Sequence, residues 1–107
     1  MTTFLDWREH ASSQPEKFFK TTLWQSEHLT LGLNCLDPGQ IQKVHAHDGA
    51  DKTYYVLEGE GHFTIGDEQR IAGMGMLIVA PAGVPHGVTN NSGQRLSLLV
   101  TISPPIK

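Results

Sequence analysis

Short stretches in which apolar and polar residues alternate account for much of the chain. Every second residue from Leu29 to Cys35 is apolar, and residues 53–57 form a run rich in aromatic and β-branched side chains. Alternation with a period of two is typical of strands, whose successive side chains point to opposite faces. The apolar run 76–80 is too short for a typical helix and also reads as a strand.

Turn signals separate these runs. Eleven glycines and six prolines are spread along the chain, and they fit tight corners between short strands. Regularly spaced short strands with such turns are typical of an all-β sandwich or barrel. We expect turns at Asp37-Pro38-Gly39, Asp48-Gly49, Gly66-Asp67, Ala72-Gly73 and Asn90-Asn91.

A length of 107 residues predicts one domain, divided into an N-terminal arm over residues 1–27 and a β-barrel over residues 28–103. Within the arm, Ser13 with Glu16 three places on resembles the start of a short helix that leads into Phe18. The apolar arm residues have no obvious place inside so small a barrel, so they predict a two-fold homodimer. These residues are Phe18, Phe19, Leu23 and Trp24.

Charge and cysteine content narrow the possible partners and compartments. Eleven acidic and eight basic residues give a formal net charge of -3, and no basic run is present, which argues against nucleic-acid binding. Cys35 is the only cysteine, so no intrachain disulfide can form, and we expect a buried thiol. The first nine residues carry charges where a signal peptide needs an apolar core, and no segment is long and apolar enough to span a membrane. A cytoplasmic protein is expected.

Three histidines are the strongest functional signal. His45 and His47 are separated by a single residue, so on a strand their side chains would point into one cavity, and His86 follows the apolar run 76–80. Imidazole is the commonest metal-binding side chain. Three imidazoles on paired strands predict a site for one divalent transition metal such as zinc, nickel, manganese or iron.

Two motifs around these histidines resemble those of the cupin family, and in particular its small single-domain bacterial members. Gly39, His45, His47 and Gly59 follow the first motif, with five residues between Gly39 and His45. The second motif has Gly75, five residues, and then Pro81, Gly83, His86 and Asn90, where Asn90 falls one place late. The resemblance covers roughly residues 32–102 and implies a double-stranded β-helix barrel of the cupin or jelly-roll type.

Lys52 departs from this pattern. The resemblance implies a metal-binding glutamate seven residues before Gly59, which is the position of Lys52. A unit positive charge about 5 Å from a dication costs roughly 6 kcal/mol at an effective dielectric near 20, before screening and relaxation. Three arrangements would relieve this cost: Lys52 turned away with Asp51 brought inward, a neutral buried Lys52, or an anion beside the metal.

Alternation places Lys52, Tyr54, Val56 and Glu58 on one face of their strand, and the resemblance implies that this face lines the cavity. An amine and a phenol beside a metal could bind an anion or transfer a proton. Lys52 and Tyr54 are therefore candidate ligand-binding residues.

Two functional classes follow from these residues. In the first, His45, His47 and His86 hold a metal that acts on a small polar or carboxylate-bearing molecule, as the resemblance to dioxygenases, isomerases and sugar-acid converting enzymes implies. In the second, the protein is a non-catalytic binding or sensor module, whose pocket of Lys52, Tyr54 and the histidines takes a small ligand without metal. Fold alone does not choose between them.

Overall fold

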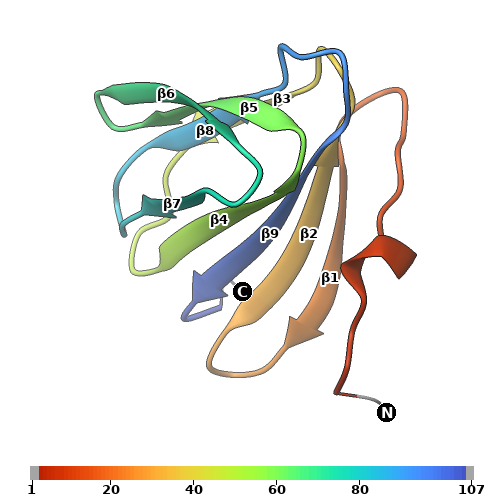
Figure 1. The fold of residues 1–107 in the computed structure, drawn as a ribbon. Helices are drawn as coiled ribbons and strands as arrows, with labels where there is room; N and C mark the ends of the chain where they lie inside the picture. Colours follow the sequence, from red (N-terminus) through yellow and green to blue (C-terminus); the bar gives the residue numbers. More distant parts are fainter. Residues whose placement is uncertain (1–2, 106–107) are drawn as a thin grey trace.

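The computed structural model describes residues 3–105 and consists almost entirely of antiparallel strands (Figure 1). The only helix in this part of the chain is the three-residue 3-10 helix η1 (Trp7–Glu9), which is far too short to cross a membrane. The strands are β1 (Phe19–Gln25), β2 (Thr30–Leu36), β3 (Ile41–His45), β4 (Asp51–Glu58), β5 (Glu60–Ile65), β6 (Glu68–Gly73), β7 (Leu77–Ala80), β8 (His86–Thr89) and β9 (Leu96–Ser103).

The strands form two sheets that face each other (Figure 1). The larger sheet has the order β1-β2-β9-β4-β7, and the smaller sheet has the order β3-β8-β5-β6. Strands far apart in the sequence are neighbours in both sheets, as β2 and β9 show. The predicted all-β class and double-stranded barrel are confirmed.

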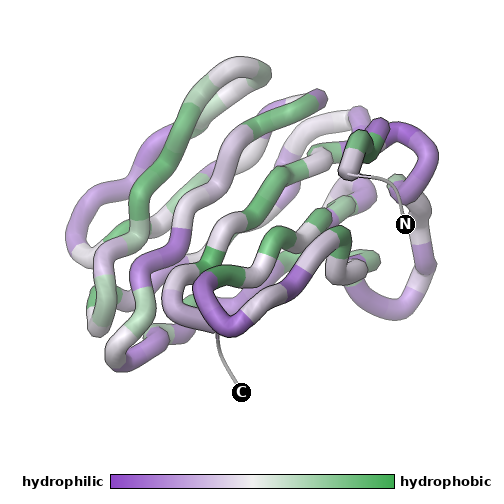
Figure 2. Tube along the Cα trace, turned by 90° about the horizontal axis from the view of Figure 1, so that it is seen from below, coloured by the Kyte–Doolittle hydropathy of each residue, from purple (hydrophilic) through white to green (hydrophobic). Residues whose placement is uncertain are grey.

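The predicted alternation explains the core between the sheets, and Figure 2 shows apolar and polar positions alternating along the strands. In β4, Lys52, Tyr54 and Val56 are buried, whereas Asp51 and Tyr55 are exposed. β4 thus gives one set of side chains to the interior, as a period of two requires. The core cluster comprises Leu36, Tyr54, Val56, Phe63, Ala72, Val88, Leu96, Leu98 and Val100.

The structure extends the larger sheet into the predicted N-terminal arm. Phe19–Gln25 form the edge strand β1, which pairs with β2, and Phe18 packs against the core rather than projecting from the barrel. The arm therefore supplies a strand, and Phe18 has a place inside the barrel that the sequence did not reveal. The Ser13 hydroxyl donates to Asp37 at 2.8 Å.

The predicted helix after Ser13 is wrong. Residues 15–17 form a bend, and polar groups on both sides of it bond to other segments instead of capping a helix. The side chain of Gln14 donates to the Phe18 carbonyl, and Gln40 donates to the Gln14 carbonyl at 2.7 Å. These bonds hold the segment in an irregular path over the turn at residues 37–40.

Three of the predicted turns lie where the sequence placed them, and Asn90 begins the loop between β8 and β9. The turn assigned to Ala72-Gly73 is displaced, because β6 continues through Gly73 and the chain reverses at Met74 and Gly75. Gly75 has a φ of 92°, a conformation that favours glycine, so it rather than Gly73 makes the corner.

Asn90, the last residue of the second motif, is fully buried and organises this loop. Its amide nitrogen donates to the carbonyls of Leu36 and Gln94, both at 2.8 Å. Its side-chain oxygen accepts from the backbone and hydroxyl of Ser92. Asn90 thus ties the β8–β9 loop to the end of β2. The predicted buried thiol of Cys35 is also confirmed.

Three glycine substitutions should separate backbone strain from steric overlap. Gly59 has a φ of 78°, and a Cβ there would lie 2.3 Å from the Arg95 carbonyl oxygen, so Gly59→Ala should lower the free energy of unfolding by about 3 kcal/mol. A Cβ at Gly75 would meet no neighbouring atom, so Gly75→Ala brings backbone strain alone and should lower the free energy of unfolding by about 1 kcal/mol.

Gly93 supplies the control, because its φ is ordinary and a Cβ would enter open space. Gly93→Ala should change the free energy of unfolding by no more than about 0.5 kcal/mol. Urea denaturation of the three variants measures the order. A Gly59→Ala protein as stable as the Gly93→Ala protein would contradict the close contact between Gly59 and Arg95.

Candidate metal centre

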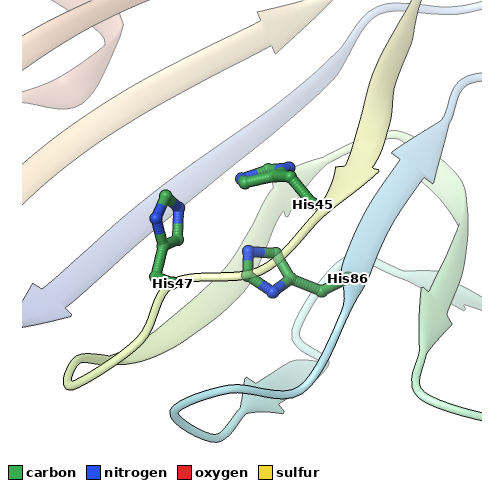
Figure 3. Close-up of side chains that lie close together, drawn as sticks. All are labelled: His45, His47 and His86. Atoms are coloured by element: carbon green, nitrogen blue, oxygen red, sulfur yellow. The ribbon is translucent and has the colours of Figure 1, made fainter.

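The three histidines predicted from the sequence lie together at one end of β3 and β8 (Figure 3). His45 is the last residue of β3, and it pairs with His86, the first residue of β8. His47 lies two residues beyond the end of β3, so the prediction that one strand carries both His45 and His47 is only half right. The ladder between β3 and β8 ends at His45, and the chain then enters the turn at Asp48 and Gly49.

The three rings nevertheless share one space. The ring centroid of His45 lies 4.7 Å from the centroid of His47 and 4.4 Å from the centroid of His86. The centroids of His47 and His86 are 5.4 Å apart. One nitrogen atom from each ring can be chosen so that all three lie within 4.8 Å of one another. This is a spacing that one metal ion can bridge with small side-chain adjustments.

Backbone carbonyls orient two of the rings. His45 Nδ1 lies 2.7 Å from the Lys43 carbonyl oxygen, and His86 Nδ1 lies 3.0 Å from the Val84 carbonyl oxygen. A carbonyl oxygen only accepts, so each Nδ1 is the donor and each Nε2 is the ring nitrogen left to face a metal. Metal-binding histidines in proteins are commonly held by this type of bond.

His86 Nε2 has no hydrogen-bond partner, and it is alone in this among the buried side-chain nitrogen and oxygen atoms that the structure describes. Burial lowers the pKa of His86 to about 4, and burial followed by the charge of His45 lowers the pKa of His47. Both imidazoles are therefore neutral at pH 7, with lone pairs available. An unpartnered buried nitrogen beside two further imidazoles fits a bound metal, because no group between residues 3 and 105 satisfies it.

Gly87 allows the two strands that carry these histidines to approach closely. A Cβ at Gly87 would lie 2.9 Å from both the Gln42 carbonyl oxygen and the Val44 nitrogen, which are backbone atoms of β3. A larger residue would push β3 away from β8 and separate His45 from His86. The sequence did not predict this role of Gly87, because a glycine between His86 and Val88 does not indicate which strand will pair closely with it.

Lys52 points into the barrel. Its side chain is buried, with a relative exposure of 3%, and Nζ lies 4.7 Å from the centre of the Tyr54 ring. Asp51 is exposed and accepts a bond from the Ala82 nitrogen at 2.9 Å, so it does not replace Lys52. Burial, and then the charge of Lys20, lower the pKa of Lys52 to about 8, so the ammonium form still dominates at pH 7. Of the three arrangements considered, the turned-away lysine is wrong.

Tyr54 is placed differently from the prediction. It is fully buried, its hydroxyl donates to the side-chain oxygen of Gln42, and burial raises its pKa. Tyr54 is not among the residues that line the cavity beside the histidines, whereas Gln42 is. Tyr54 therefore contacts the cavity wall only through its hydrogen bond to Gln42 and through its ring, which lies near Lys52 Nζ.

A cavity of about 420 Å³ opens beside His45 and His47, between the two sheets. Its wall includes residues that the sequence analysis did not assign to the site: Lys20, Thr21, Thr22, Thr30, Gly32, Asn34, Gln42, Val100 and Ile102. Lys20 and the threonines lie on β1 and β2, whereas the sequence predicted that residues 1–27 form an arm outside the barrel. A prediction of β1 as a strand of the barrel would have placed Lys20, Thr21 and Thr22 near the site.

Comparisons with known proteins agree with this fold and these motifs. Residues 32–102 match the Cupin domain family. The chain is 35% identical over 83 residues to the uncharacterized protein SCO3923 of Streptomyces coelicolor. The aligned region covers 76% of this chain and 75% of the relative. The solved structure of TT1209 from Thermus thermophilus is 44% identical, covers 98% of this chain and 100% of its own, and has a TM-score of 0.94.

A second solved structure supports the same assignment. An RmlC-like cupin protein from Desulfovibrio desulfuricans is 31% identical, with coverage of 99% of this chain and 100% of its own and a TM-score of 0.87. Together with the domain match over residues 32–102, these similarities confirm the resemblance drawn from the two histidine motifs. The chain belongs to the cupin family.

Proposed function

We propose that the protein binds one divalent transition metal through His45, His47 and His86, and uses it to bind a small carboxylate-bearing molecule in the adjacent cavity. The observation that carries the proposal is His86 Nε2, which is buried, unprotonated and without a partner, and faces two further imidazoles. Leaving such an atom unsatisfied costs about 1–3 kcal/mol, which a bound metal would recover.

Three neutral nitrogen donors favour zinc, nickel, manganese or iron over calcium, which prefers oxygen ligands. With only three side chains as ligands, the metal keeps open positions that can polarise a bound oxygen or activate water. Lys52 in the cavity wall supplies a positive charge that attracts a carboxylate. Turnover of that molecule, as in the dioxygenases, isomerases and sugar-acid converting enzymes of the family, is the enzymatic form of this proposal.

The alternative is a binding or sensor module that uses Lys52, Tyr54 and the histidines without metal. The lysine in place of the family's usual glutamate favours this alternative. Two observations weigh against it: the Tyr54 hydroxyl is engaged by Gln42, and His86 Nε2 is left unpartnered when no metal is bound. The metal-dependent function is therefore preferred.

Metal analysis of protein purified without an affinity tag tests the central proposal. The wild type incubated with excess zinc, nickel or manganese at neutral pH should retain about one metal per chain, and His86→Ala should lose most of the affinity because it removes one of three ligands. His62→Ala is the matched control, since His62 lies on β5 away from the three-histidine cluster. A wild type that stays metal-free in all three solutions would exclude the metal site and leave the metal-free module.

Substitutions at Lys52 test its effect on the metal. Lys52→Glu replaces repulsion by a negative ligand, and Lys52→Met removes the repulsion alone, so metal affinity should rise in the order wild type, Met, Glu, with at least about tenfold between the extremes. Competition with a metal-binding dye measures the metal affinity of each protein. Lys17→Glu makes the same charge change at an exposed position outside the cavity and should have little effect. Equal affinities in all four proteins would show that the Lys52 charge does not act on the metal.

We further propose a homodimer that packs through the outer face of the larger sheet. The register places Trp24, Leu31, Thr101, Thr53 and Val79 in one row across all five strands, and the next row contains Leu77 beside Tyr55. Leu77 and Val79 are more than half exposed, so this face presents apolar side chains to solvent. An isologous contact through this face would cover both copies equally.

Light scattering at micromolar concentration tests the homodimer. The wild type should have twice the mass of the 11.8 kDa chain, and Leu77→Lys should shift it to the monomer, because the charge would be buried between two copies. Ile71→Lys is the matched control, since Ile71 is also exposed and apolar but lies on β6 of the other sheet. A monomeric wild type would contradict the proposed homodimer.

A further inference from the structure

Two lysines from different strands of the larger sheet face the same cavity. Lys20 lies on the edge strand β1 and Lys52 on β4, and both belong to the cavity wall beside His45 and His47. The register pairs Lys20 with Asn34, which also lines the cavity, and Lys20 itself is exposed on the edge strand. The two ammonium groups are close enough that the charge of Lys20 contributes to the lowered pKa of Lys52.

Neither lysine has an anionic partner in the described part of the chain. The ion pairs between residues 3 and 105 use only arginine or histidine as the cation. The cavity wall also contains no aspartate or glutamate, although the chain has eleven acidic residues and only eight basic ones. A buried cation without a counter-ion is costly, and the contact of Lys52 with the Tyr54 ring offsets only part of that cost.

The arrangement of charge in the cavity indicates what would occupy it. His45 and His47 line the cavity from the side of the smaller sheet. The larger sheet supplies the ammonium groups of Lys20 and Lys52, whose charges reach His47, with Thr22 and Asn34 as neutral hydrogen-bonding groups. A ligand with one carboxylate would offset only one of the positive charges that a metal and two lysines bring to this cavity. A volume of about 420 Å³ is near the lower limit for small-molecule sites, so the ligand is small.

We propose that the cavity selects a small molecule with two anionic groups, one bound at the three-histidine metal and the other bound by Lys20 and Lys52. Only the anionic group at the metal rests on the proposed function. The site for the second anionic group, called the lysine end, is inferred from the placement of two unpaired cations, Lys20 and Lys52, in one cavity. Lys20 and Lys52 are thus specificity-determining residues, because they distinguish a dianion from a monoanion of the same length.

Calorimetric titration of zinc-loaded protein with two probes of equal chain length tests the proposal. Glutarate has a carboxylate at each end, and pentanoate has only one. The wild type should bind glutarate at least about tenfold more tightly than pentanoate. Lys20→Met and Lys52→Met should each reduce this preference severalfold, because they weaken glutarate binding more than pentanoate binding.

Lys17→Met is the matched control, because it removes the same charge from an exposed position outside the cavity wall. It should keep the wild-type preference for glutarate. Zinc content is measured for every protein before titration, so that a change in metal occupancy is not mistaken for a change in anion binding. Equal binding of the two probes by the wild type, or an unchanged preference in both lysine variants, would overturn the proposal.

Titration of metal-free protein separates this inference from the proposed function. If zinc does not bind at all, the proposed function fails, but the lysine end can still be tested. Metal-free wild type should then bind glutarate weakly and in a salt-dependent manner, and Lys20→Met and Lys52→Met should both weaken that binding. Loss of the effect in metal-free protein, together with an unchanged preference in zinc-loaded protein, would exclude the lysine end while leaving the metal site intact.

Discussion

The close approach of β3 to β8 is the constraint on which the candidate site depends. The two strands belong to the smaller sheet, and their ladder ends where His45 lies opposite His86. Gly87 makes this approach possible, since any side chain there would meet the β3 backbone at 2.9 Å. The carbonyls of Lys43 and Val84 then orient both rings, so backbone geometry rather than side-chain packing aligns two of the three imidazoles.

The larger sheet forms another part of the cavity wall, and it brings the positive charges of Lys20 and Lys52 to it. Lys52 is inward because β4 alternates strictly, which buries Tyr54 and Val56 on the same face. Lys52 cannot be turned outward by shifting β4 by one residue, because that shift of register would also expose Tyr54 and Val56. The barrel therefore keeps a cation inside at the cost of its desolvation, and the lowered pKa of Lys52 reflects that cost.

Much of this could be predicted from the sequence, because the decisive information is local. Alternation and apolar runs predicted β2, β4 and β7, and the spacing of His45 and His47 predicted neighbouring rings even though β3 ends at His45. The strand β1 was missed for a physical reason. Its pairing with β2 shifts register between Thr22 and Trp24, and this bulge breaks the alternation that identifies a strand in sequence. Lys20 lies before the bulge and faces the cavity, so the same irregularity hid both the strand and the second cation.

On the proposed function, Lys52 at the position of the expected glutamate makes metal binding and ligand binding depend on each other. A glutamate would neutralise part of a dication before any ligand arrived, whereas three neutral imidazoles and two ammonium groups leave the cavity strongly positive once a metal is bound. On the proposed function, an anion in the cavity lowers the repulsion that the metal experiences, and the metal raises the affinity for the anion by the same factor, since coupling between two sites is reciprocal. On the same proposal, the ligand supplies the negative charge that a glutamate at position 52 would have supplied, and metal retention and ligand binding form one coupled equilibrium.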